Sequence, residues 1–319
     1  MLSFRVSYMC IYRVRDGFYF IDVKPLGCES FLSVYVIKGG DGYVLVETGP
    51  KSSIKYLIQG LNAASIPLDK VKYVFLTHIH VDHAGGCGTL LKYLPNAKVI
   101  MHPKAVQYMV DTFKLWESSL KVLGAIAEMF GEVEPIPRDR IIEGIDGLTI
   151  SLDGLTLKVI DAVGHASHEL CLHYIEENGL FTGDAAGTYV EKLNAIRPTT
   201  PPIFHLRKAI ETLDKLISLN PSKLFYSHFG PADKAVEKLK RHREQLIKWG
   251  VITAKGLERN LSIDEIYSRI IEVDEDMRIM DQYLKGSLII EEIPRCIQGF
   301  IDYFKRYPDE LLKWRNLKL

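Results

Sequence analysis

Two strand-rich blocks, each followed by helical segments, constrain the fold of this chain more than any other feature. In the first block, short apolar runs are separated by turn residues, at 18–23, 31–37 and 43–47. In the second block, Asp153-Gly154 joins two apolar runs as a hairpin turn would. Helical spacing follows the blocks, at 52–62, at 103–130 as one long helix or two shorter ones, and at 204–219. This alternation predicts an α/β fold, a four-layered αββα sandwich with polar residues gathered at strand ends.

The strand pattern stops near Ala232, and the rest of the chain has the spacing of helices. Helical stretches cover about 233–250, 262–280, 291–306 and 308–316. Ser262 followed by Glu265 has the spacing of a capping box at the start of one of them. We therefore expect a catalytic domain over residues 1–232 and a small helical C-terminal domain, an extension over residues 233–319.

The densest group of chemically capable side chains is the run from His78 to His83. It holds three of the ten histidines and one aspartate, directly after the apolar run 71–76. A turn after a strand can direct His78 and His80 to one ion, while Asp82 and His83, entering a helix, face a second ion. Imidazole and carboxylate ligands suit Zn²⁺, and two neighbouring ions are a common arrangement for hydrolysis. The spacing therefore indicates a two-metal site.

The run from Thr77 to Gly86 resembles the T-H-x-H-x-D-H-x-G-G signature of the metallo-β-lactamase superfamily, and the resemblance spans about residues 1–240. Three further elements follow in the family's order: Val163-Gly164-His165, Phe181-Thr182-Gly183-Asp184 and Ser227-His228-Phe229-Gly230-Pro231. The resemblance implies that His165 joins His78 and His80 on a first metal. It likewise implies that His228 joins Asp82 and His83 on a second metal, with Asp184 bridging both. The expected fold is then the metallo-β-lactamase sandwich.

The activity that this resemblance implies is that of a binuclear metal-dependent hydrolase. The expected cofactors are two divalent metal ions, Zn²⁺ first, with Fe or Mn as possible substitutes. Histidine at position 80, where relatives with a di-iron centre usually have glutamate, favours zinc and hydrolysis. Two ions that share a water lower its pKa from about 15.7 toward neutrality, so a metal-bound hydroxide is the expected nucleophile. Asp82 is the expected catalytic residue, because its carboxylate can orient the hydroxide or carry a proton.

The sequence does not fix the roles of several residues that lie near the predicted ligands. Glu169 stands where relatives often have a second histidine, and His168 is either an outer donor to the centre or a loop histidine. Glu47 stands where many relatives have aspartate, and we expect it to support the ligands from behind. Tyr189 either contacts substrate or is an ordinary loop residue. The other histidines are expected to cap, to pack or to lie on helices without a partner: His102, His173, His205 and His242.

Charge and cysteine usage restrict the partners and the compartment. Forty basic and forty acidic residues cancel, so no overall field attracts nucleic acid or an anionic membrane. Residues 232–319 carry 17 Lys or Arg and 16 Asp or Glu, a difference of +1, which is no basic footprint. Five scattered cysteines suit a reducing cytosol. With neither a secretory pattern nor a long apolar stretch, we expect a cytoplasmic protein without membrane insertion.

The expected substrate is a small ester, thioester or lactone. A phosphodiesterase or nuclease of the same fold would need a basic exosite or an inserted domain, but only 43 residues separate Asp184 from His228. The same ligand set would also suit a mononuclear iron oxygenase or a metal-binding scaffold without enzymatic activity. The C-terminal extension resembles the winged-helix-like module of some superfamily members, and we expect it to serve as a lid, a packing module or a homodimer contact.

Overall fold

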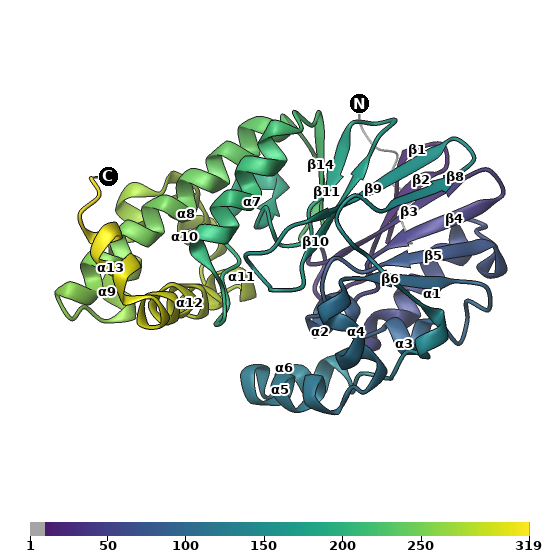
Figure 1. The fold of residues 1–319 in the computed structure, drawn as a ribbon, viewed down its shortest axis with the longest axis horizontal. Helices are drawn as coiled ribbons and strands as arrows, with labels where there is room; N and C mark the ends of the chain where they lie inside the picture. The colour runs from purple at the N-terminus through teal and green to yellow at the C-terminus, as the bar shows by residue number, and fades with distance from the viewer. Residues whose placement is uncertain (1–9, 319) are drawn as a thin grey trace.

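The computed structural model describes residues 10–318 and contains two β-sheets packed face to face (Figure 1). The first sheet has seven strands in sequence order: β1 Ile11–Arg15, β2 Phe18–Asp22, β3 Ser33–Gly39, β4 Gly42–Val46, β5 Val71–Phe75, β6 Lys98–Met101 and β7 Ile141–Glu143. The strands β1 to β4 form an antiparallel meander, whereas β4 to β7 are parallel. The hairpin between β3 and β4 turns at Gly40, whose φ of 55° favours glycine.

The second sheet has six strands in the order β15-β14-β11-β10-β9-β8. Their bounds are β8 Thr149–Leu152, β9 Leu155–Asp161, β10 Leu170–Tyr174, β11 Gly179–Phe181, β14 Lys223–Tyr226 and β15 Gly230–Asp233. The β8–β9 hairpin turns at Gly154, with φ at 71°, as the Asp153-Gly154 pair predicts. Between β11 and β14 the chain forms a separate two-stranded sheet, the hairpin of β12 Thr188–Val190 with β13 Ala195–Arg197.

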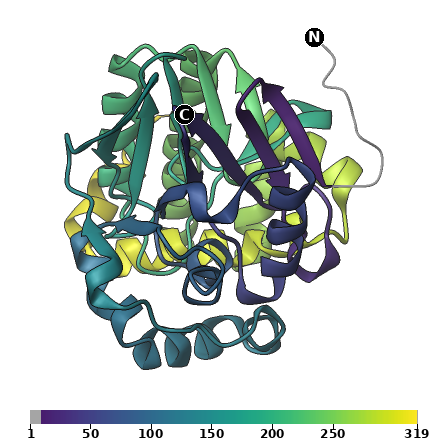
Figure 2. The ribbon, with the colours of Figure 1, turned by 90° about the vertical axis from the view of Figure 1, so that its right-hand side faces the viewer.

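Helices cover the outer face of each sheet, and Figures 1 and 2 show the resulting layers. The first sheet carries α1 Ile54–Ala63, α2 Val81–Ala84, α3 Cys87–Leu90, α4 Pro103–Val110, α5 Phe113–Leu123 and α6 Ala125–Phe130. On the outer side of the second sheet lie α7 Leu206–Ser218 and α8 Ala235–Glu258. The other C-terminal helices pack on α8 and on one another: α9 Ile263–Val273, α10 Glu275–Leu284, α11 Leu288–Glu291, α12 Ile293–Arg306 and α13 Pro308–Arg315. The predicted four-layered αββα sandwich with a helical C-terminal region is confirmed.

An aromatic core joins the two sheets. Phe225 lies 4.9 Å from Phe18 and 4.7 Å from Phe181 between ring centroids, and all three side chains are buried. Tyr35 packs on the same group and donates its hydroxyl to the Tyr226 carbonyl at 2.7 Å. Burying aromatic rings of this size supplies a large part of the hydrophobic stabilisation. The two sheets are thereby fixed relative to each other, which also fixes the relation between their edges.

The predicted helices differ from the observed ones mainly where a polar residue interrupts a periodic stretch. The stretch 103–130 contains three helices, because Asp111 is extended and Gly124 has a φ of 56°. The stretch 262–280 is divided at Asp274, whose side chain caps α10 by accepting from Met277 N. Tyr189, for which one expectation was an ordinary loop position, lies in β12 of the β12–β13 hairpin, which the sequence pattern did not predict.

Within the described residues, every element after β15 is a helix, so no β-wing of a winged-helix module is present there. These helices share one continuous apolar core with α7 and the second sheet. The domain boundary near residue 232 remains a prediction. None of the helices in residues 10–318 combines the length and the apolar character needed to cross a membrane.

Candidate metal centre

Three strands of the second sheet end at the same edge, and each is followed by a predicted ligand. Because β10 pairs antiparallel with β9 and with β11, and β11 pairs parallel with β14, the strands β9, β11 and β14 run in one direction. His165 follows β9, Asp184 follows β11 and His228 follows β14. The order of pairing alone therefore gathers three residues that are far apart in the sequence.

The first sheet supplies the other ligands from the end of β5. His78 follows this strand, and His80 directly precedes the single turn α2, which contains Asp82 and His83. Between the ligands, Ile79 and Val81 are buried in the apolar core under the helices. This burial of alternate apolar residues turns the intervening polar side chains toward the second sheet.

The first group of ligand atoms comes from His78, His80 and His165. One ring nitrogen from each lies within 4.8 Å of the others. His165 Nε2 is 2.9 Å from His80 Nδ1. Burial lowers the pKa of His80 to about 3 and that of His78 well below its usual range, so both rings are neutral at pH 7. Neutral imidazole is the form that offers a lone pair to a metal.

The second group consists of Asp82, His83 and His228, whose ligand atoms also lie within 4.8 Å of one another. His83 Nε2 is 3.1 Å from His228 Nε2 and 3.5 Å from Asp82 Oδ2. Burial alone would lower the pKa of His83, but the carboxylates of Asp82, Asp184 and Glu47 outweigh it and raise this pKa to about 10. A cation bound here would therefore displace a proton.

Asp184 lies between the two groups. Its Oδ2 atom is 3.5 Å from His165 Nε2, while its Oδ1 atom is 3.4 Å from His83 Nε2 and 3.7 Å from His228 Nε2. One carboxylate thus faces both groups. Within residues 10–318, neither Asp184 Oδ1 nor His78 Nε2 has a hydrogen-bond partner, although both atoms are buried. An unsatisfied buried polar atom costs about 1–3 kcal/mol, and divalent cations in the two groups would satisfy both. The donor set therefore fits two metal ions.

Outer partners fix the orientation of the histidine rings. His165 Nδ1 donates to the Thr199 carbonyl at 2.8 Å, and His228 Nδ1 donates to the Phe31 carbonyl at 2.7 Å. His78 Nδ1 lies 3.0 Å from Thr77 Oγ1. In each of these histidines, Nε2 is left as the atom that faces the centre. Such outer hydrogen bonds are typical of metal-binding histidines.

Glu47 lies underneath both groups and is completely buried. Its Oε1 accepts from Thr77 Oγ1 at 2.5 Å and from Ser227 Oγ at 3.0 Å, and it lies 3.2 Å from His83 Nδ1. The φ of 72° at Glu47 is a strained value for a non-glycine residue, and such strain concentrates at functional sites. These contacts agree with the supporting role expected for Glu47, although its carboxylate also lies within ligand distance of His78 and His83.

Glu169 and His168 have different surroundings. Glu169 Oε1 accepts from the backbone N–H of Asp184 at 2.8 Å, so this residue holds the turn that carries the Asp184 carboxylate. Burial and the nearby Asp184 charge raise the pKa of Glu169 well above its usual range. His168 stacks on His78 with ring centroids 6.4 Å apart and makes an edge contact with His80 at 6.1 Å. Its ring thus borders the first group without a hydrogen bond to it.

The remaining candidates lie outside the centre. His102 caps α4 by accepting from Lys104 N, as expected, and His205 caps α7 in the same way. Tyr189 donates to Asn194 and stacks on Tyr226, so it is a structural residue of the β12–β13 hairpin. The expectation that His205 and His242 have no partner is wrong, since His242 Nδ1 also lies 3.4 Å from Gln245 Oε1.

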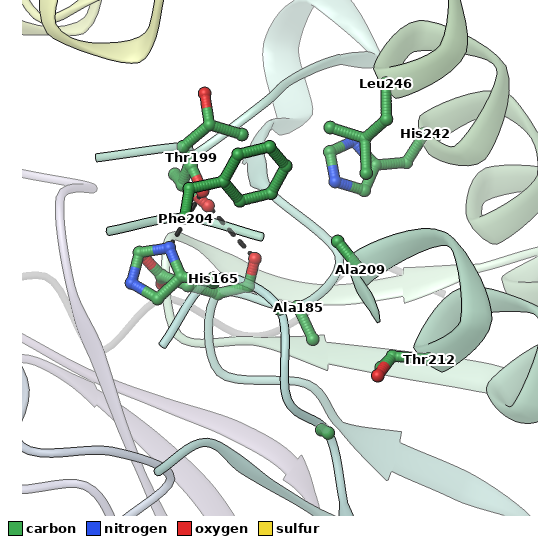
Figure 3. A pocket seen from close by; sticks show the side chains of 12 residues that line it. His165, Ala185, Thr199, Phe204, Ala209, Thr212, His242 and Leu246 are labelled. Carbon is green, nitrogen blue, oxygen red and sulfur yellow. Dashed lines mark hydrogen bonds and ion pairs between the residues drawn. The ribbon is translucent and has the colours of Figure 1, made fainter. Parts of the chain in front are cut away.

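A small cavity of about 10 Å³, room for about one water, lies behind the first group. Figure 3 shows His165 and Thr199 on one side of it and His242 and Leu246, both from α8, on the other. A dashed line there joins Thr199 to His165, and Thr199 also donates its hydroxyl to the Asp184 carbonyl. The C-terminal helices thus reach the back of the centre, a contact that no local sequence signal indicated.

The fold and this centre define an αββα protein with a candidate two-metal site at the joined edges of its sheets. A family profile described as the metallo-beta-lactamase superfamily matches residues 30–228. The metallo-beta-lactamase fold-containing protein ST1585 of Sulfurisphaera tokodaii is 30% identical over 72% of this chain and 84% of its own length. Its crystal structure superposes with a TM-score of 0.62, covering 72% of this chain and 85% of that one. This chain belongs to the metallo-β-lactamase superfamily.

Two further relatives extend the comparison. The metallo-beta-lactamase family protein TTHA1429 of Thermus thermophilus shares the fold over 93% of this chain and 95% of its own, with a TM-score of 0.67 and 18% identity. A protein of Emericella nidulans named atrochrysone carboxyl ACP thioesterase is 28% identical over 57% of this chain and 48% of its own length. Membership of the superfamily supports a metal-dependent hydrolase in general.

Proposed function

We propose that this protein is a binuclear metal-dependent hydrolase that cleaves a small ester, thioester or lactone. The first metal position consists of His78, His80 and His165. The second consists of Asp82, His83 and His228, with Asp184 shared between the two. Imidazole and carboxylate donors of this kind favour Zn²⁺, with Fe or Mn as possible substitutes.

One observation carries this proposal, the placement of the Asp184 carboxylate. Its two oxygens face different groups, with Oδ2 3.5 Å from His165 Nε2 and Oδ1 3.4 Å from His83 Nε2. A carboxylate serving a single metal would have no reason to lie between two sets of donors. Two ions at such positions would supply a water of lowered pKa and polarise the scissile carbonyl oxygen.

The protein's own groups would orient and exchange protons around the substrate. Asp82 Oδ2 lies 3.4 Å from His228 Nε2 and, of the four carboxylates described around the centre, its side chain is the most exposed, at 23%. With Oδ2 on the side of the second metal, its Oδ1 would orient the attacking water and take up its proton. The carbonyls of Thr199 and Phe31 would hold His165 and His228 in place throughout. Asp82 is therefore the proposed catalytic residue.

The substrate class follows from what surrounds the centre. The segment between Asp184 and His228 is filled by β12, β13, α7 and β14, which leaves no inserted domain of the kind a nuclease would need. The overall charge of zero supplies no attraction for a polyanion. The similarity to a named thioesterase favours carbonyl substrates. We therefore propose a small molecule rather than nucleic acid as the partner.

The proposal is tested with a panel of ester, thioester, lactone and phosphodiester substrates in the presence of Zn²⁺ or Mn²⁺, together with measured metal content. We expect two ions per chain and turnover of at least one carbonyl substrate. The variant Asp184→Ala should lose both the metals and turnover. Asp161→Ala, at the end of β9 and paired with His102, is the control and should keep both.

Two results would overturn the proposal. One is the absence of turnover on every substrate with two ions bound. The other is a fully active Asp184→Ala protein without metal. Preferential cleavage of the phosphodiester would replace the carbonyl class, and a single bound iron would favour a mononuclear iron oxygenase instead.

A further inference from the structure

The segment 195–200 connects the first metal position to the C-terminal helices. At its end, Thr199 contacts two ligands at once. Its carbonyl accepts from His165 Nδ1 at 2.8 Å, and its hydroxyl donates to the Asp184 carbonyl at 3.0 Å. Figure 3 shows the hydrogen bond between Thr199 and His165. The position of this backbone therefore sets the orientation of His165 and the position of Asp184.

Helix α12 forms a hydrogen bond with Thr200, the residue after Thr199. Thr200 Oγ1 donates to the Cys296 carbonyl at 2.9 Å, and both residues are buried. Cys296 Sγ lies 3.4 Å from the Pro198 carbonyl on the other side of Thr199. A Cβ atom at Gly299 would collide with the Thr200 carbonyl, so α12 and the segment are in backbone contact. The segment thus has no room to shift toward α12.

Helices α8 and α10 hold the start of the same segment. The backbone N–H of Ile196 donates to Asp276 Oδ2 at 3.1 Å, and its carbonyl accepts from Gln245 Nε2 at 2.7 Å. Asp276 and Gln245 are buried at 1% and 3% exposure, so water cannot replace these bonds. Breaking either bond would leave a buried polar group without a partner.

The rings of the second metal position are held mainly from the other side of the centre, although the His228 carbonyl accepts from Tyr189 N at 2.6 Å, on the strand that pairs with residues 195–197. His83 Nδ1 faces Glu47, at the end of β4, and His228 Nδ1 donates to Phe31, before β3. Both of these partners belong to the first sheet, on the opposite side of the centre. A disturbance of the C-terminal helices should therefore affect the two positions unequally.

We propose that the C-terminal helices α8, α10 and α12 set the geometry of the first metal position through the segment 195–200, and that Thr200 is a positioning residue for His165. This inference rests on the proposed two-metal centre. Loss of an outer partner of a metal ligand typically weakens metal binding 10–100-fold. Because Thr200 acts one residue away from the carbonyl that contacts His165, we expect about a tenfold loss, at the lower end of that range.

The test measures Zn²⁺ affinity by chelator competition at each position separately. In a His228→Ala background, the ion that remains reports the first position, and in a His165→Ala background it reports the second. Thr200→Val, which keeps the side-chain shape and removes the hydroxyl, should weaken binding about tenfold in the first background and clearly less in the second, where the segment acts only through the shared Asp184 and the β12–β13 hairpin. Thr200→Ser should restore the affinity, because its hydroxyl can again reach the Cys296 carbonyl.

Thr253→Val is the matched control, since Thr253 is buried in α8 and its hydroxyl has no partner within the described residues. It should change neither affinity. A second pair of variants uses steric displacement: Gly299→Ala pushes on the segment, whereas Gly256→Ala pushes only on side chains of Ile266 and Leu261.

The inference would be overturned if Thr200→Val lowered Zn²⁺ affinity equally at both positions, or did not lower it at the first position. Either result would leave the hydrolase proposal intact. Failure of the unaltered protein to bind two ions would instead remove the proposed centre itself. A first-position loss in Thr253→Val as large as in Thr200→Val would also overturn the inference, because the effect would then come from general destabilisation.

Discussion

Replacing His242 by glutamine should make this protein less sensitive to acid. His242 is 2% exposed in α8, and burial lowers its pKa to about 4. The only groups that favour its charged form are the nearby Gln245 side chain and, more weakly, the Asp184 carboxylate. The imidazole must therefore remain neutral in the folded protein, while in the unfolded chain it titrates near 6.5.

The sign and size of the effect follow from this difference. Between pH 6.5 and pH 4 the unfolded chain binds more protons at this residue, so the free energy of unfolding falls as the pH falls. The contribution is fully present above pH 6.5 and lost below it. A difference of about 2.5 pH units corresponds to about 3 kcal/mol in total, of which about 2 kcal/mol is lost by pH 5.

Urea unfolding of the metal-free protein at pH 8, 6.5 and 5 would measure this. Other groups also titrate in this range, so the informative quantity is the difference in pH dependence between the unaltered protein and His242→Gln. We expect the variant to lose about 2 kcal/mol less than the unaltered protein between pH 8 and pH 5. Identical pH dependence of the two proteins would refute the reasoning, because His242 would then titrate alike in both states.

Two further substitutions test the centre and the core. Glu47→Gln keeps the side-chain shape but removes the charge of the carboxylate that contacts His83, Thr77 and Ser227. Metal affinity, measured by chelator competition, should therefore fall about 10–100-fold. Unchanged affinity would contradict the supporting role of Glu47. Phe225→Ala leaves a cavity between Phe18 and Phe181 in the core between the sheets and should cost about 3–5 kcal/mol in urea unfolding. A cost below about 1 kcal/mol would mean that the two sheets can close over the gap.

Much of the fold was predictable from local patterns. The turns at Gly40 and Gly154, the apolar runs of the central strands and the capping box at Ser262 all occur where the sequence indicates. Each of these signals depends on residues within a few positions of one another. The break at Asp274 was missed because apolar periodicity continues across it, whereas the backbone there is decided by a single cap. The stretch 103–130, expected as one long helix or two shorter ones, is broken twice, at Asp111 and at Gly124.

The grouping of the candidate ligands was predictable in part. The types and spacing of His78 to His83 indicated a turn that serves two positions, and the resemblance assigned His165, Asp184 and His228 to them. The structure brings all seven residues together. The roles of His168 and Tyr189 could not be resolved from sequence, because they depend on which rings lie beside them.

The sequence by itself determined which residues can bind metal and which segments can form strands and helices, because ligand chemistry and hydrophobic periodicity are local properties. The tertiary structure alone decided that Glu169 holds the turn that carries Asp184. It also decided that α12 contacts the segment 195–200, which lies about a hundred residues earlier in the chain. These contacts depend on how the sheet edges and the C-terminal helices pack, and packing between distant segments leaves no periodic signal in a single chain.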